Sequence, residues 1–444
     1  MRWKALNLQS WGRTCSDSCL ATRPERVSEA ISSLADVDAS GLLAHGAGTS
    51  YGDVGLNPGG RVLLTQRLNR LLAFDPETGE VVAEPGVTIA DLLRVFPPRG
   101  YTIPVSPGTA FVTLGGAVAN DVHGKNHEGA GSFCNHVRWL DLLLPSGEIV
   151  RAGPDQRPAL FQATAGGVGL TGVILAVCLR LVKTQSNGMR VDERRIADLD
   201  GFLAALEEAE PGAHSVGWID ALSGGRALGR GILQVGRVAA EPAPPPSGRT
   251  RSLPIDLPGF ALNPLTVAAF NALYWRRVPM GGRQRLLAYE TFSYPLDALL
   301  QWNRLYGRRG FHQFQCVVPT AEGPTALRRL LEEASRARAA SFLAVLKRLG
   351  DGRAGFLSFP RAGYTLAMDF PHRSGTLALL GRLEWIVRDH GGRLYLAKDS
   401  AMSPEGFAEM YPELDPFRAV LAEVDPNGRM TSALARRLKL RGTA

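Results

Sequence analysis

The chain has 444 residues, which is too long for one hydrophobic core and predicts two or three domains. Hydrophobic residues make up 45% of it and charged residues 21%, a balance that excludes wholesale disorder. The formal net charge is +8, and arginine supplies nearly all of the basic residues. We infer no nucleic-acid function from this bias, although a basic excess favours phosphate-bearing ligands or an anionic membrane surface.

The sequence predicts neither a membrane span nor a metal site. Its longest apolar run, Leu170 to Leu179, ends at Arg180 and falls short of the roughly 20 residues that a spanning helix needs. No continuous apolar stretch marks the N-terminus, so we expect no secretory signal. The cysteines are scattered without zinc-ligand spacing, which favours reduced thiols and a cytoplasmic location: Cys15, Cys19, Cys134, Cys178 and Cys316.

In chain order, residues 1–183 alternate short apolar runs with glycine-rich turns, a pattern typical of strands. The string TIADLLRVF within them predicts a short helix that begins after Thr88. Composition separates residues 184–392 from residues 1–183 before them and residues 393–444 after them.

The middle segment predicts helices at residues 198–210, 325–339 and 376–392, and strands at FHQFQCVVP and YTLAMDF. Proline-rich composition predicts a mobile surface loop around residues 239–282. After residue 392 the string RLYLAKDS predicts a return strand, followed by two helical segments and a basic end.

A glycine-rich loop, GAGTSYGD at residues 46–53, follows the strand-like string LLAH. Glycines in such a loop let backbone N–H groups approach a diphosphate closely, and Thr49 and Ser50 can add hydrogen bonds. It is neither a Walker A loop nor a GxGxxG turn before a helix. Taken alone, the loop favours a structural glycine turn over a binding site.

A second motif, residues 107–133, contains small residues at which a flat cofactor could lie against the backbone. Within it His123, Lys125 and His127 alternate, so on an extended segment they would share one face. A metal site would need a third ligand that the sequence does not offer, and a polar loop is the alternative. Two further motifs are ATAGGVGLTGVILAV at residues 163–177 and YLAKDS at residues 395–400. Lys398 in the latter is notable because lysine is rare in this chain.

Together these motifs resemble FAD-binding oxidoreductases of the vanillyl-alcohol-oxidase type, with their PCMH-type FAD-binding domain. Within that superfamily the strings SYGD, DVHGKNH, GLTG and RLYLAKDS are similar to the decaprenylphosphoryl-β-D-ribose 2′-oxidase family. The resemblance runs nearly end to end. It implies an α+β, two-domain fold. A substrate domain built on an antiparallel sheet, residues 184–392, is inserted into an FAD-binding domain formed by residues 1–183 and 393–444.

The resemblance also implies roles for individual residues. Those expected to bind FAD are Gly46, Ala47, Gly48, Thr49, Ser50, Tyr51, Gly52, Asp53, Gly108, Thr113, Leu114, Gly115, Gly116, Asn120, Asp121, Val122, His123, Ile174 and Tyr395. Those expected to line the substrate pocket are Lys125, Tyr294, Gln313, Gln315, Lys347, Ala367 and Lys398. Lys398, Tyr51 and His123 are the candidates for the catalytic base, and the sequence does not rank them.

Two positions depart from the family pattern. Mycobacterial members carry a cysteine where this chain has Ala367, so electrophiles that trap that thiol should not inhibit this protein. Some relatives attach FAD through a histidine just before the loop serine. Here Thr49 holds that position, so we expect non-covalent FAD.

The implied activity is oxidation of the 2′-hydroxyl of a polyprenyl-phosphoryl ribose, the first half of an epimerisation to the arabinose form in cell-wall arabinan synthesis. An NADH-dependent keto-sugar reductase would be the partner. Peripheral contact with the inner face of the membrane would bring the protein to its lipid-linked substrate. The alternatives are a soluble sugar or alditol oxidase of the same superfamily, and a non-catalytic flavoprotein scaffold.

Overall fold

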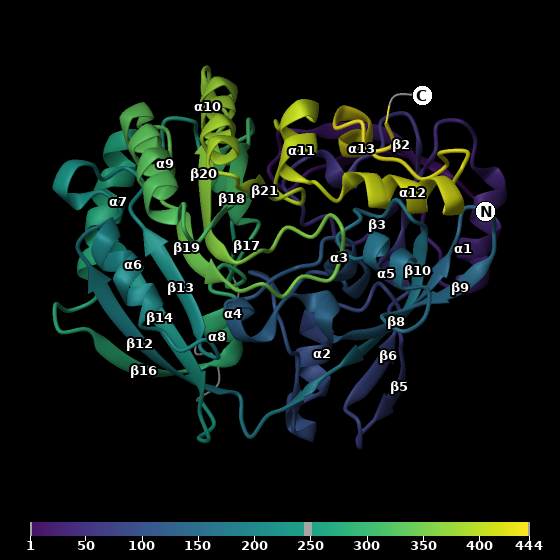
Figure 1. Ribbon diagram of the computed structural model, residues 1–444, viewed down its shortest axis with the longest axis horizontal. Coiled ribbons are helices and arrows are strands. Elements are labelled where there is room, and N and C mark those ends of the chain that lie inside the picture. Colours follow the sequence, from purple (N-terminus) through teal and green to yellow (C-terminus); the bar gives the residue numbers. More distant parts are fainter. Residues whose placement is uncertain (1, 244–250, 443–444) are drawn as a thin grey trace.

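The computed structural model describes residues 2–243 and 251–442 (Figure 1). Its largest element is an eight-stranded sheet in which every pairing is antiparallel. In spatial order its strands are β16 (Arg283–Ala288), β12 (Gly188–Ile196), β14 (Gly231–Val238), β13 (His214–Ile219), β19 (Ala344–Leu349), β20 (Gly363–Pro371), β18 (Phe311–Pro319) and β21 (Arg393–Leu394).

Two smaller sheets are built from the N-terminal part of the chain. One contains β1 (Lys4–Gln9), β2 (Ser16–Thr22), β4 (Arg61–Leu64) and β3 (Leu42–His45). The other contains β5 (Leu71–Asp75), β6 (Glu80–Ala83), β10 (Val173–Arg180), β8 (Val137–Leu143) and β9 (Ile149–Ala152). Two further pairs join β7 (Tyr101–Thr102) to β11 (Val182–Lys183) and β15 (Arg251–Ser252) to β17 (Leu299–Leu300).

Helices cover these sheets. In the N-terminal part they are α1 (Val27–Ser33), α2 (Ile89–Val95), α3 (Leu114–Ala119), α4 (His127–Ala130) and α5 (Pro158–Thr164). The middle segment contributes α6 (Leu199–Glu207), α7 (Pro264–Arg276), α8 (Tyr289–Ser293), α9 (Gly323–Ala337) and α10 (Thr376–Asp389). The last three are α11 (Pro404–Met410), α12 (Leu414–Val424) and α13 (Ala433–Arg437), which return across the N-terminal sheets (Figure 1).

The mixture of helices and largely antiparallel sheets confirms the expected α+β class. Several elements form for the reasons read from the sequence. Helix α2 begins after Thr88, whose side chain accepts from the backbone N–H of Asp91 in a capping box. The predicted helices of the middle segment are α6, α9 and α10, and the predicted strands are β18 and β20.

The expected loop around residues 239–282 is wrong in its middle part, because α7 occupies 13 of these residues. Asn263 caps this helix by accepting from the N–H groups of Leu265 and Thr266, and Pro264 stands in the first turn, where proline is tolerated. The proline content of this segment therefore wrongly indicated a loop at the residues that form α7. Residues 244–250 of the same segment lie outside the described part of the chain.

The return segment also differs from its prediction. Only Arg393 and Leu394 of RLYLAKDS form a strand, and they pair with Val317 and Cys316 at the edge of the eight-stranded sheet. The chain then turns, and three helices follow where two were expected. The division into residues 1–183 with 393–444 and residues 184–392 stays a prediction.

Candidate active site

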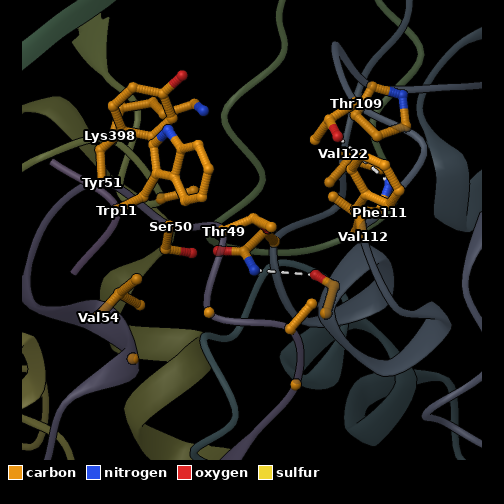
Figure 2. A pocket seen from close by; sticks show the side chains of 18 of the residues that line it. Trp11, Thr49, Ser50, Tyr51, Val54, Thr109, Phe111, Val112, Val122 and Lys398 are labelled. Atoms are coloured by element: carbon orange, nitrogen blue, oxygen red, sulfur yellow. Dashed lines mark hydrogen bonds between the residues drawn. The ribbon is translucent and has the colours of Figure 1, made fainter. Parts of the chain in front are cut away.

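A cavity of about 610 Å³ lies between the N-terminal sheets and one face of the eight-stranded sheet. Its volume is within the range usual for small-molecule sites. Figure 2 shows Trp11, Tyr51 and Lys398 gathered on one side of it, Thr109, Phe111, Val112 and Val122 on the other, and Thr49 with Ser50 between them.

The glycine loop that follows β3 forms one wall of this cavity. Among the described residues, no protein acceptor receives the backbone N–H groups of residues 46–50. Gly52 must be glycine, because a Cβ there would lie 1.6 Å from the carbonyl oxygen of Asp399. This close approach, with the hydrogen bond from Tyr51 N to Ala397 O at 3.0 Å, fixes the loop to the C-terminal segment. The loop thus presents unpaired backbone donors on a fixed frame.

The wall opposite is the start of α3. Thr113 caps this helix by accepting from Gly116 N, and a Cβ at Gly46 would meet the Thr113 hydroxyl oxygen at 2.4 Å. The two glycine segments therefore approach each other closely. Asn120 ends the helix, and its Nδ2 donates to the Gly116 carbonyl oxygen at 2.9 Å.

The eight-stranded sheet supplies the third wall through alternate residues of β18, β19 and β20. In register across these strands, Val345 pairs with Ala367, and Ala367 pairs with Gln315. Paired residues point to the same side of a sheet, so Lys347 and Thr365, which also pair, share this face.

Lys398 reaches the cavity from the turn after β21, with its Nζ 3.6 Å from the centroid of the Tyr51 ring. Burial lowers the pKa of Lys398 to about 7, a shift opposed by the Asp369 carboxylate and strengthened by Lys347. Burial also raises the pKa of Tyr51 well above its ordinary value. Near neutral pH the phenol is therefore protonated, while the amine exists in both states.

A second buried amine, that of Lys347, lines the cavity from β19. Burial lowers its pKa to about 8, and within the described part of the chain it forms no salt bridge with a carboxylate. Asp369 on β20 accepts from Gln313 Nε2 at 2.6 Å and from the Tyr306 hydroxyl at 3.1 Å. Burial raises the pKa of Asp369 to about 7, so the wall carries more positive than negative charge and suits an anion.

His123 stands where the α3 wall meets the sheet. Burial lowers its pKa well below the ordinary value, so its imidazole is neutral near pH 7. Gln315 Nε2 lies 3.1 Å from His123 Nε2, and since an amide nitrogen can only donate, the ring proton belongs on Nδ1. Both His123 Nδ1 and Asn120 Oδ1 are buried without a hydrogen-bond partner among the described residues.

These features fit FAD. Unpaired backbone N–H groups in a glycine loop match a diphosphate. A cleft between close-packed glycines leaves room for a flat ring system, and the two unpartnered polar atoms, Asn120 Oδ1 and His123 Nδ1, provide an acceptor and a donor beside it.

All but five of the sequence-predicted site residues line the cavity; the exceptions are Asp53, Leu114, Asp121, Lys125 and Tyr294. Asp53 instead accepts two hydrogen bonds from Arg437, each 2.8 Å long. Leu114 is fully buried in the core. The carboxylate of Asp121 accepts from Ser132 Oγ, Ser358 Oγ and Cys134 N, and so holds the residues behind the wall.

Lys125 and Tyr294 also lie behind the wall. The Lys125 amine donates to the Phe292 carbonyl oxygen and sits 4.2 Å from the Phe292 ring centroid, and Tyr294 forms a hydrogen bond with Ser106. The expectation that His123, Lys125 and His127 share one face is wrong, because the chain turns at Lys125 and α4 begins at His127.

Sequence reasoning missed several lining residues, including Trp11, Phe111, Trp302, Val345 and Thr365. Val345 and Thr365 alternate with Lys347 and Ala367 in their strands, so strand periodicity could have identified them. No local signal marks Trp11 or Trp302, which tertiary packing brings to the cavity.

The described residues offer neither a membrane-spanning helix nor a metal cluster. None of their helices is long and apolar enough to cross a membrane. Within the same residues, no cluster of three or more histidine, cysteine or acidic side chains could hold a metal ion.

Comparison with known proteins agrees with this geometry. The family described as "FAD binding domain" matches residues 20–153, and the family described as "D-arabinono-1,4-lactone oxidase" matches residues 303–438. The decaprenylphosphoryl-beta-D-ribose oxidase of Mycolicibacterium smegmatis is 37% identical over 98% of this chain and 97% of its own. A Streptomyces coelicolor protein from the mprA 5' region is 35% identical over 80% of this chain and 100% of its own. Bovine (Bos taurus) L-gulonolactone oxidase is 29% identical over 40% of this chain and 41% of its own.

The similarity to the Mycolicibacterium enzyme covers the glycine loop, the sheet face and the Lys398 turn together, since it spans nearly the whole of both chains. This chain therefore belongs to the decaprenylphosphoryl-β-D-ribose oxidase family, and it is an FAD-dependent oxidoreductase with the two-domain fold of the vanillyl-alcohol-oxidase superfamily.

Proposed function

We propose that this protein oxidises the 2′-hydroxyl of a polyprenyl-phosphoryl-β-D-ribose to the 2′-keto sugar, the first half of an epimerisation to the arabinose form. One observation carries the proposal: a single cavity joins a loop of unpaired backbone donors to the buried amines of Lys347 and Lys398. The first group suits the diphosphate of FAD, and the second suits a phosphorylated sugar.

At the cofactor end, residues 46–50 hold the diphosphate, and Gly115, Gly116 and Asn120 border the ring system. FAD, when bound, supplies the acceptor for the hydride that leaves C2′. Thr49 offers a hydroxyl where covalent attachment would need a histidine. FAD should therefore remain in the supernatant when the protein is precipitated with acid, and flavin retained on the precipitate would contradict non-covalent binding.

At the substrate end, the face of β18, β19 and β20 binds the sugar. Gln313 and Gln315 orient its hydroxyls through their amides, and Lys347 binds the phosphate as an unpaired ammonium. Ala367 leaves a small apolar surface between them. The side chains of β18, β19 and β20 thus position C2′ of the sugar, and none of them takes the hydroxyl proton.

Lys398 is the base that accepts the hydroxyl proton. Tyr51 holds its own proton near neutral pH, because burial raises the pKa of its phenol. In His123, the Nε2 lone pair already accepts from Gln315. Lys398, whose pKa burial lowers to about 7, has a neutral fraction at physiological pH and lies directly over the Tyr51 ring.

The substrate's polyprenyl tail implies contact with a membrane surface. The keto product must be reduced to complete the epimerisation, which implies a separate NADH-dependent reductase. The basic net charge of the chain supports the first of these partners. Within the described residues the contact would be peripheral, since none of their helices could span a bilayer.

The test is anaerobic mixing of the FAD-loaded protein with a polyprenyl-phosphoryl ribose while flavin absorbance is recorded. We expect bleaching with this substrate and none with free ribose or an alditol. Bleaching by a free alditol at least as fast would instead indicate a soluble sugar oxidase. A flavin that no alcohol bleaches would indicate a non-catalytic flavoprotein.

A further inference from the structure

Helix α7 has an unusual sequence for a helix at the surface. Its 13 residues, PLTVAAFNALYWR, include a single charged side chain, Arg276. One face packs on the eight-stranded sheet, where the Tyr274 ring lies 4.7 Å from that of Trp218 and Asn271 Nδ2 donates to Asp220 at 2.7 Å. A helix that is apolar on all sides is ordinarily buried on all sides. This one is not.

The outward face of α7 is an exposed apolar stripe. Leu265 is 76% exposed and Leu273 is 72% exposed, with exposed alanines at positions 268 and 269 between them. The spacing of three, four and eight residues places these side chains on one side of the helix. Phe260 (78% exposed) and Met280 (80% exposed) flank its two ends. We call these six residues the α7 stripe.

The surroundings of the α7 stripe are basic. Residues 251–286 contain five arginines and one acidic residue, Asp256, which Arg13 neutralises at a distance of 2.6 Å. Arg251, Arg276 and Arg285 are exposed, and within the described residues they form no salt bridge. Free guanidinium groups around an apolar stripe complement the phosphates that border the apolar interior of an anionic bilayer.

Helix α7 lies on the same face of the eight-stranded sheet as the cavity. Trp218, on which α7 packs, pairs in register with Val345, so α7 covers the same sheet face that forms the cavity wall. The segment before α7 also pairs with β17, and both Ser252 and Leu300 line the cavity. Figure 1 shows α7 at the left of the view, across the molecule from α11, α12 and α13.

We propose that the α7 stripe and its free arginines dock on an anionic phospholipid bilayer. Docking here sets the cavity beside the membrane surface, so that a lipid-linked sugar can enter while its tail stays in the bilayer. This last step rests on the proposed function, whereas binding to the bilayer does not.

The test is flotation with vesicles of phosphatidylcholine, with and without phosphatidylglycerol. We expect the FAD-loaded protein to float with the anionic vesicles and to be released by salt, which screens the arginines. Leu265→Glu and Leu273→Glu should each weaken binding at least about tenfold, because burial of a leucine is lost and a carboxylate is placed against anionic headgroups. Arg276→Glu with Arg285→Glu should weaken it about fivefold or more for each charge removed.

The controls change exposed leucines on other elements. Leu377→Glu on α10 and Leu72→Glu on β5 start from leucines that are 52% and 50% exposed, and both should leave flotation unchanged. As a reporter, Phe260→Trp should show blue-shifted emission with anionic vesicles and quenching by brominated lipid. Retained flotation of the Leu265 and Leu273 variants, or equal loss in the controls, would overturn the assignment.

Failure of docking and failure of the proposed function can be told apart. A wild-type protein that ignores vesicles but oxidises a short-chain, water-soluble substrate has the function without the docking surface. One that floats but oxidises no polyprenyl-phosphoryl ribose has the surface without the function. If the wild type forms a dimer in solution that Leu273→Glu dissociates, the stripe joins two copies of the chain and the bilayer proposal is wrong.

Discussion

The protonation state of Lys398 is controlled by where its amine lies rather than by a bonded partner. The amine stands over the Tyr51 ring, and burial brings its pKa to about 7. A protonated lysine is a hydrogen-bond donor, whereas a neutral one is a base, so both states matter for an alcohol oxidation.

We predict that Lys398→Ala retains FAD and loses about 2–4 kcal/mol of transition-state stabilisation, which is about 30- to 1000-fold in kcat/KM. Lys398→Arg should not restore the rate, because a guanidinium stays charged and its planar fork does not fit the place of a compact amine. Flavin content and stopped-flow reduction rates provide the measurement. Lys183→Ala, at an exposed lysine on β11, is the control, and a near-normal rate in either Lys398 variant would remove this residue from the mechanism.

The pH dependence of the reductive half-reaction separates the two roles of Lys398. A base must be neutral, and the fraction of neutral amine rises with pH through its pKa of about 7. We therefore expect kcat/KM to fall about tenfold per pH unit below this value, to level off above it, and to decline again above about pH 8, where Lys347 loses the proton with which it binds the phosphate. Lys398→Ala should lack this limb of the profile. A rate that declines as pH rises through 7 would indicate that the ammonium form, as a donor, is the active one.

Ala367 reports on the orientation of β20. Its register partners are Gln315 and Val345, both of which line the cavity. We predict that Ala367→Cys is alkylated by a small maleimide and protected by substrate, and that its stability changes by less than about 1.5 kcal/mol. Mass spectrometry after labelling decides the point. The wild type is the control, since four of its five cysteines are buried. A folded, FAD-loaded Ala367→Cys variant that stays unlabelled at the new thiol would mean that β20 presents its other face.

At the scale of elements, the short helix α3 brings its backbone close to the cavity. Its sequence, LGGAVA, contains two glycines, which weaken a helix but remove the side chains that would fill the space beside it. The Thr113 cap offsets part of this loss of helix stability, because its hydroxyl accepts from the Gly116 N–H group in the first turn.

We predict that Gly116→Val abolishes FAD retention without unfolding the protein. A Cβ at this position meets only Thr113 Oγ1 at 3.1 Å and Val112 at 3.9 Å, so the protein itself nearly accommodates the side chain. The valine methyls would instead occupy space bordering the cavity. Flavin content after gel filtration and circular dichroism are the measurements. The control is Gly381→Val on α10, where a Cβ meets nothing within 4 Å. A Gly116→Val protein that is fully loaded with FAD would show that the cofactor does not lie beside this residue.

At the scale of the whole molecule, the C-terminal segment closes the site. The carbonyl of Ala397 receives the Tyr51 N–H, and Arg437 on α13 binds the carboxylates of Asp53 and Asp399 together at 2.8 Å. Residues nearly 400 positions apart are thereby held around one loop. Asp53, expected to contact the cofactor, serves this closure instead.

We predict that Arg437→Met destabilises the folded state by about 3 kcal/mol, because it leaves two largely buried carboxylates facing each other without a cation. Chemical denaturation and FAD affinity measure the effect. Arg336→Met, which removes a pair that is 70% exposed on the arginine side, should cost less than about 1 kcal/mol, and equal effects of the two changes would contradict the closure role.

Much of this protein follows from its sequence. The cap at Thr88, the period of α9 and α10 and the apolar runs of β18 and β20 are local signals, since helix and strand propensity depend on neighbours along the chain. The glycine loop, the HGKNH string and the Lys398 turn are local too, and most of the site residues predicted from the sequence line the cavity.

Only the tertiary structure decided how these pieces meet. Lys125 turns away from the cavity and Asp53 turns to Arg437, while Trp11 and Trp302 arrive from distant segments. The cause is that direction and burial depend on long-range packing, which one stretch of sequence does not encode by itself. The same holds for the pKa of Lys398, because desolvation is a property of the closed cavity.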